Sequence, residues 1–133
     1  MQEETLSQRV RGYLDRVVNQ HDLAEVGRLV SPSYRGSGFG WPADHELLME
    51  FYRWQARSRP SWRIDVQSTL EVGDVVVVHA HAGGTVSAAD PHRPDAAPVA
   101  SAVEWLAAYR FAEDLIVEIQ VLQVRDRSAE YPR

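Results

Sequence analysis

The sequence contains no cysteine and no lysine, and it has no long hydrophobic run. The absence of cysteine excludes disulfides, thiolate nucleophiles and cysteine metal ligands, and it fits a reducing compartment, so we expect a cytoplasmic location. The longest unbroken apolar stretch is far shorter than a membrane span. The first residues, MQEETLSQRV, have neither the basic start nor the apolar run of a signal peptide. We therefore expect no membrane partner.

The charge pattern argues against a nucleic-acid partner. The net charge is −5, and the arginines, which supply every basic side chain, are scattered among acidic residues. No glycine-rich phosphate loop, nucleophile elbow or HExxH helix is present, so phosphoryl transfer and serine-hydrolase chemistry have no support. With 133 residues, 44% of them apolar, the chain is predicted to form one domain over residues 1–133, with a core over 6–124 and a polar tail over 125–133.

Apolar residues at helical spacing predict three helices in the first half of the chain. The first spans residues 6–18, and the second, with Asp22 as its predicted N-cap, spans 23–30. The third begins after Asp44 and ends before Pro60. Its predicted buried stripe consists of Leu47, Leu48, Phe51, Tyr52 and Trp54. The segment 31–42, rich in glycine, serine and proline, is predicted to be a loop.

After Pro60 the apolar period changes to two, which predicts strands. In the first strand, the residues predicted to face the core are Trp62, Ile64, Val66 and Leu70. Three more strands are predicted, one starting at Val75 and the others over 99–111 and 115–124, with a proline-rich loop over 87–98. Helices followed by strands joined as hairpins indicate an α+β fold, with the helices on one face of an antiparallel sheet. Strands that curve around a helix form a cone, and its interior is a natural small-molecule pocket.

The stretch VVVVHAHAGG places His79 and His81 at alternate positions of a predicted strand, so both imidazoles point to one face. Three interpretations stay open. The histidines are exposed on the outer face or satisfied in the core. Alternatively, they face the pocket, where imidazole suits acid–base chemistry. In the third interpretation they share a zinc ion, with Glu104 or His92 as a third ligand. We assign no metal ligand and expect no cofactor.

Three stretches carry a resemblance to a known family: YLDRVVNQHDLAEVGRLVSPSY, EVGDVVVVHAHAGGTV and YRFAEDLIVEIQVLQ. Together they resemble the SnoaL-like family of the nuclear transport factor-2-like superfamily, over Leu6 to Val124. The VHAH strand, the Asp90-Pro91 loop and the triplet Tyr109-Arg110-Phe111 are similar to members described as polyketide-cyclase or aldol-condensation types. The resemblance implies a cone-shaped α+β barrel, with three N-terminal helices packed in the concave face of a curved antiparallel sheet.

The resemblance also implies a hydrophobic cavity, cofactor-free acid–base chemistry and commonly a homodimer. Val121 occupies the position of the aspartate base of the cyclases, and Ala107 and Ser37 also depart from the family pattern. The remaining candidates for base and oxyanion-stabilising donor are His79 and His81. The residues predicted to hold an apolar or polycyclic carbonyl ligand are Tyr34, Trp41, Phe51, Trp54, Trp105, Tyr109, Val121 and Gln123.

Two functions follow as alternatives. The first is a cofactor-independent cyclase or isomerase that enolises a carbonyl-bearing or polyketide-type substrate, and it requires an imidazole in place of the missing carboxylate. The second is a non-catalytic ligand-binding or dimerisation module on the same fold, which predicts tight binding without turnover.

Overall fold

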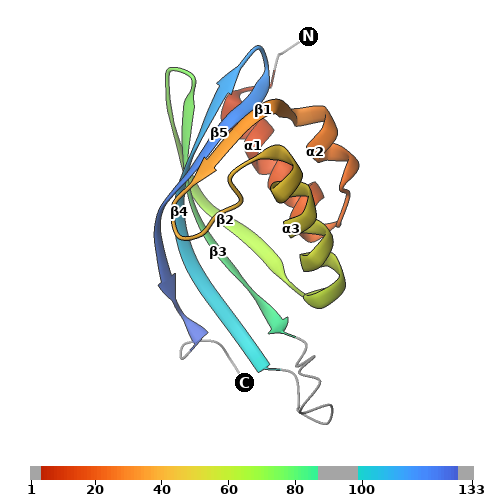
Figure 1. Ribbon diagram of the computed structural model, residues 1–133. Coiled ribbons are helices and arrows are strands. Elements are labelled where there is room, and N and C mark those ends of the chain that lie inside the picture. Colours follow the sequence, from red (N-terminus) through yellow and green to blue (C-terminus); the bar gives the residue numbers. More distant parts are fainter. Residues whose placement is uncertain (1–3, 87–98, 129–133) are drawn as a thin grey trace.

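The computed structural model describes residues 4–86 and 99–128. In chain order, its elements are helix α1 (Leu6–Leu14), the π-helical turn η1 (Asp15–Asn19), helix α2 (Ala24–Leu29), strand β1 (Val30–Ser37), helix α3 (His45–Ser58) and strands β2 (Arg63–Val72), β3 (Val75–Val86), β4 (Val99–Ala112) and β5 (Leu115–Asp126). Figure 1 shows a long curved sheet with the helices gathered on one side of it. The predicted α+β fold is confirmed.

The sheet has five strands in the order β1-β5-β4-β3-β2 and does not close into a barrel. Strands β2 to β5 are antiparallel to their neighbours, as predicted, but β1 pairs with β5 in parallel. The prediction of a loop over 31–42 is therefore wrong for its first part, which continues β1 to Ser37. Because β1 lies at the sheet edge and bonds to one neighbour only, it tolerates Pro32, which has no N–H to donate.

Local capping explains where two of the helices begin. Thr5 and Gln8 form a capping box at the start of α1. At the start of α3, the Asp44 carboxylate accepts a hydrogen bond from the Leu47 backbone N–H at 2.9 Å, as predicted. The prediction that Asp22 caps the second helix is wrong, because α2 begins after Leu23 and its start has no side-chain cap.

The two faces of β3 have opposite environments. Val76, Val78 and Ala80 are fully buried on the concave face. The intervening residues point to the convex face, because successive strand residues alternate. The concave face and the helices enclose the core, whose largest fully buried side chains include Tyr13, Tyr34, Tyr109, Leu14 and Leu48.

A bulge in β2 changes which residues face the core. Trp62 and Ile64 are buried, as predicted, but the register with β3 shifts between Val66 and Ser68. The extra residue reverses the alternation, so Leu70 is 62% exposed, and its predicted burial is wrong. The buried stripe of α3 also differs from the prediction, because Leu47 and Trp54 are exposed.

Strand β5 extends further along the chain than predicted. Arg125 and Asp126, assigned above to a polar tail, are the last residues of β5 and pair with Glu104 and Val103. The predicted loop over 87–98, which contains His92, lies outside the described residues, as does 129–133. Within the described part of the chain, no helix is long and apolar enough to cross a membrane.

Candidate functional site

A cavity of about 280 Å³ lies between the concave face of the sheet and the helices. Its lining is mostly apolar and comes from α1, η1, α3, the segment after β1 and all four of the antiparallel strands. The lining residues used below are Gly38, Trp41, Phe51, Gln55, Arg59, Trp62, Trp105 and Val121. Ala82, also in the lining, is a small buried residue on the concave face of β3.

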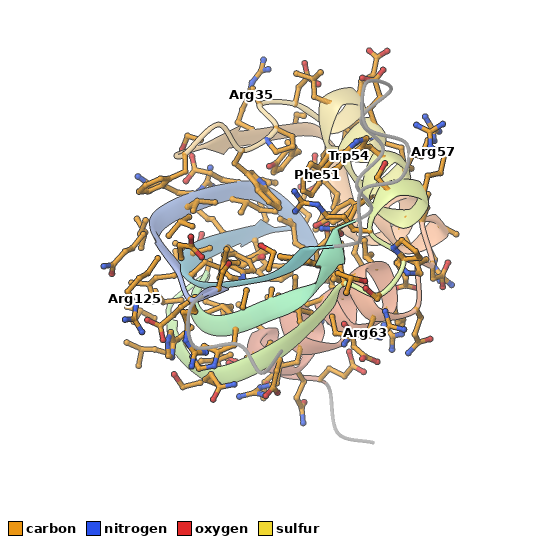
Figure 2. The ribbon with its side chains drawn as sticks, turned by 90° about the horizontal axis from the view of Figure 1, so that it is seen from below. Arg35, Phe51, Trp54, Arg57, Arg63 and Arg125 are labelled. Carbon is orange, nitrogen blue, oxygen red and sulfur yellow. The ribbon has the colours of Figure 1, made fainter. Side chains whose placement is uncertain are left out.

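Aromatic contacts fix one wall of this cavity. The indole of Trp41 stacks on that of Trp105, with ring centroids 6.2 Å apart and an interplanar angle of 21°, and it also packs against Phe51 at 5.1 Å. Figure 2 shows Phe51 and Trp54 near each other on α3. The wall presents flat apolar surfaces, which suit a flat ring.

A hydrogen-bond chain positions Trp41. Its indole N–H donates to the Tyr34 hydroxyl at 3.0 Å, and that hydroxyl donates to the Pro42 carbonyl at 3.1 Å. Gly36 allows this close approach, because a Cβ there would lie 2.3 Å from the Tyr34 hydroxyl oxygen and 2.0 Å from the Pro42 carbonyl oxygen. Tyr34, predicted as a ligand contact, is therefore a buried support for Trp41 and does not line the cavity.

Gln55 is the buried amide of the cavity. Its side chain belongs to the lining, although the residue is only 6% exposed. Within the described part of the chain, no hydrogen bond satisfies this amide. Because the amide both donates and accepts hydrogen bonds and lines the cavity, Gln55 is a candidate to bind a polar group of a ligand.

Arg59 brings a positive charge to the same cavity. Its guanidinium carbon lies 4.8 Å from the Trp54 ring centroid and 5.0 Å from that of Trp62. Its Nε is buried and has no hydrogen-bond partner among the residues that the structure describes, and burial lowers the pKa of the guanidinium from its usual value. No carboxylate among the described residues pairs with it. The site is therefore suited to an anionic or electron-rich oxygen.

The buried tyrosines around the cavity offer no base at neutral pH. The Tyr13 hydroxyl donates to that of Tyr52 at 3.2 Å. Burial raises the pKa of Tyr52 to about 12 and raises the pKa values of Tyr34 and Tyr109 above their usual value as well. Among the described lining residues, none carries a carboxylate or an imidazole.

His79 and His81 lie outside the cavity. They sit on the convex face of β3, where their side chains are 38% and 30% exposed, and both imidazole Nε2 atoms approach the Glu104 carboxylate. Hydrogen bonds from His79 and His81 lower the pKa of Glu104 to about 2. The prediction that these histidines face the pocket is therefore corrected, because the helices pack on the other face of the strand.

The remaining predicted ligand contacts fall into two groups. Trp41, Phe51, Trp105 and Val121 line the cavity. Trp54 lies on a shallow outer groove, and Gln123 is exposed on the convex face opposite Leu106. Tyr109 is fully buried, and its hydroxyl has no hydrogen-bond partner within residues 4–86 and 99–128.

Sequence reasoning missed Gln55 and Arg59. A usable signal existed for Gln55, because it follows Phe51 at an interval of four and so shares its side of α3. Arg59 directly follows the end of that helix.

Comparison with known proteins agrees with this architecture. A family model described as a SnoaL-like domain matches residues 10–119. A SnoaL-like polyketide cyclase from Agrobacterium tumefaciens has a similar structure, with a TM-score of 0.71 and 15% identity over 96% of this chain and 97% of that one. Wild-type IdmH from Streptomyces antibioticus superposes with a TM-score of 0.72 and 18% identity, covering 94% of each chain. TsrD from Streptomyces laurentii gives 0.73 and 14%, over 94% of this chain and 92% of that one. No curated protein matches the sequence. These identities show the fold alone, whereas the family model spans most of the sequence, and the chain therefore belongs to the SnoaL-like domain family.

Proposed function

We propose that the cavity binds a small, flat, apolar molecule that carries a carbonyl or carboxylate group. The observation that carries this proposal is the Arg59 guanidinium, which lines the cavity and whose buried Nε has no hydrogen-bond partner among the described residues. Leaving such a buried donor unsatisfied costs roughly 1–3 kcal/mol, so a ligand oxygen that accepts a hydrogen bond from this guanidinium gains affinity.

The dimensions of the cavity narrow the ligand class. A volume of about 280 Å³ is at the small end of the range for ligand pockets. It favours a molecule of about two fused rings over the larger polycycles considered from the sequence. The stacked indoles of Trp41 and Trp105 supply a flat apolar wall for such rings.

Arg59 and Gln55 would recognise the polar end of the ligand. The guanidinium donates charge-assisted hydrogen bonds to an oxygen, and the amide either donates or accepts one. Gln55 lies in the last turn of α3 and Arg59 directly follows its last residue, so both reach the cavity from the same end of the helix. This arrangement supports a preference for an anionic ligand over its neutral analogue.

Two bicyclic probes test the proposal: 2-naphthoate, which is anionic, and 2-naphthamide, which is neutral. We expect 2-naphthoate to bind the wild-type protein more tightly. Arg59→Gln should weaken naphthoate binding by about tenfold or more and change naphthamide binding little, because only the charged contact is lost. Gln55→Leu should weaken both probes. Titration calorimetry measures all these affinities.

Matched controls come from the same chain. Arg57→Gln removes an exposed arginine from α3, two residues before Arg59, and Gln123→Leu removes the glutamine that the sequence placed in the pocket. Neither change should alter the affinity of either probe. The proposal is overturned if naphthoate does not bind, or if Arg59→Gln leaves the ratio of the two affinities unchanged.

A second candidate function is cofactor-free cyclase or isomerase chemistry on a carbonyl substrate. Arg59, whose Nε has no hydrogen-bond partner in the described part of the chain, lines the cavity with Gln55 and favours this chemistry, because both groups would stabilise the oxygen of an enolate. His79 and His81 cannot serve as the base, since they lie on the opposite face of the sheet. No carboxylate replaces them among the described lining residues, so the geometry supports binding better than enolisation.

Proton exchange separates the two functions. NMR would follow deuterium incorporation alpha to the carbonyl of 2-tetralone, a bicyclic ketone. A binding module leaves the exchange at the rate of buffer alone, and this is the result we expect. Acceleration that disappears in Arg59→Gln would instead establish enolisation in the cavity.

A homodimer formed through the convex face and a cytoplasmic location stay predictions from the resemblance and the composition. Sedimentation at high micromolar concentration tests the dimer, and a purely monomeric profile would exclude it.

A further inference from the structure

A second cluster of polar side chains lies on the convex face, away from the cavity. His79 and His81 come from β3, and Glu104 comes from β4 directly opposite His81. The Glu104 Oε2 lies 3.1 Å from the Nε2 of His79 and 2.9 Å from that of His81. One donor atom from each residue lies within 4.8 Å of the other two.

This donor set matches a known coordination chemistry. Two imidazole nitrogens and one carboxylate oxygen form a common three-residue site for zinc, with a fourth position left to water. Metal–ligand bonds of about 2.0–2.2 Å in a tetrahedron separate the donor atoms by roughly 3.3–3.5 Å. The two nitrogen–oxygen distances need to open by a few tenths of an ångström to reach this spacing, and the two imidazole nitrogens, which lie within 4.8 Å of each other, need to move closer together. We propose that His79, His81 and Glu104 bind a divalent transition-metal ion such as Zn²⁺ on the convex face.

The backbone holds the three ligands in place. Strands β3 and β4 pair without a register shift from Val75 to Val86, and the three residues lie inside this ladder. The side chains are 38%, 30% and 26% exposed, so an ion reaches them from solvent. Ligands on paired strands lose little freedom when they bind, which favours affinity. All three come from one chain, so the site does not depend on a second copy.

Two arginines modulate the site. Arg125 Nε donates to the other oxygen of Glu104, Oε1, at 3.2 Å, and so orients the carboxylate while leaving Oε2 to the ion. Arg127 Nη1 lies 2.6 Å from His81 Nδ1. An imidazole that binds metal through Nε2 carries its proton on Nδ1, so the Arg127 contact must be released. Its charge also repels a cation, and we expect removal of Arg127 to strengthen metal binding.

Titration of Zn²⁺ into the metal-free full chain tests this site by calorimetry. We expect saturable binding of one ion per chain. His79→Gln, His81→Gln and Glu104→Gln should each weaken binding at least tenfold, whereas Arg127→Gln should strengthen it severalfold. His21→Gln and His45→Gln are the matched controls, since both histidines lie outside the cluster, and neither should change the affinity.

Co²⁺ gives an independent readout, because its visible absorption reports the donor atoms and their number. The spectrum should indicate nitrogen and oxygen ligands and should be lost in His81→Gln. Circular dichroism checks that each variant is folded. Because Arg127→Gln keeps all three ligands, it still tests the proposal if a ligand variant fails to fold. The absence of saturable Zn²⁺ binding overturns the proposal. So does binding that survives Glu104→Gln, or that falls equally in His45→Gln.

Discussion

Replacing Val121 by tryptophan is expected to weaken 2-naphthoate binding by about a hundredfold or more. Val121 lies on the concave face of β5 and lines the cavity, and only 6% of the residue is exposed. An indole at this position would occupy much of the volume of about 280 Å³ and leave no room for two fused rings. The folded protein should survive the change, because the added apolar side chain fills existing space.

The neighbouring residue provides the control. Gln120 is exposed on the same strand and pairs with Ala108, so Gln120→Trp adds the same side chain outside the cavity. We expect wild-type affinity in this variant. Calorimetric titration measures both affinities, and thermal unfolding verifies the fold. If Val121→Trp binds naphthoate as tightly as the wild type, the ligand occupies a different site.

Replacing Gly38 by alanine is expected to lower the free energy of unfolding by about 3 kcal/mol or more. Two effects combine at this position. Gly38 has a φ of +93°, which side chains rarely adopt, and an added Cβ would lie 2.0 Å from the Val121 carbonyl oxygen. The opposing group is backbone of β5, so relief requires movement of a strand. Since Gly38 also begins the segment that carries Trp41, ligand binding should weaken too.

Replacing Gly27 by alanine is expected to change the free energy of unfolding in the opposite direction. Gly27 lies in α2, and an added Cβ would meet nothing within 4 Å. Gly27→Ala should therefore raise the free energy of unfolding by roughly 0.5–1 kcal/mol, through the helix propensity of alanine. Urea unfolding measures both variants. A Gly38→Ala protein as stable as the wild type would show that the turn after β1 relaxes freely.

Patterns among residues close in sequence were sufficient to predict most of the helices and strands. The capping aspartate before α3, the change of period after Pro60 and the hairpin turns each depend on residues close in sequence. Strand β1 was not predicted, because Pro32 and Gly36 lie within it and are typical of loops. Its partner in the described sheet, β5, is also more than 80 residues later in the chain.

The candidate site was harder to predict, because strand alternation fixes relative faces but not which face is inside. Valines fill both faces at the start of β3, so the sequence did not show whether His79 and His81 lie inside or outside. On β5, Val121 and Gln123 were predicted to share a face. The register with β4 shifts between these residues, and Gln123 turns outward while Val121 remains in the cavity.

The sequence by itself determined the α+β class, the antiparallel order of β2 to β5, and the pairing of the two histidines on one face, because each follows from the spacing of neighbouring residues. Only the tertiary structure decided which face the helices cover. That choice encloses Gln55 and Arg59 with the aromatic wall and leaves His79, His81 and Glu104 together on the outside. The physical reason is that the face of a sheet that becomes core depends on the apolar area that all its strands bury together. The pattern of one strand alone does not determine that face.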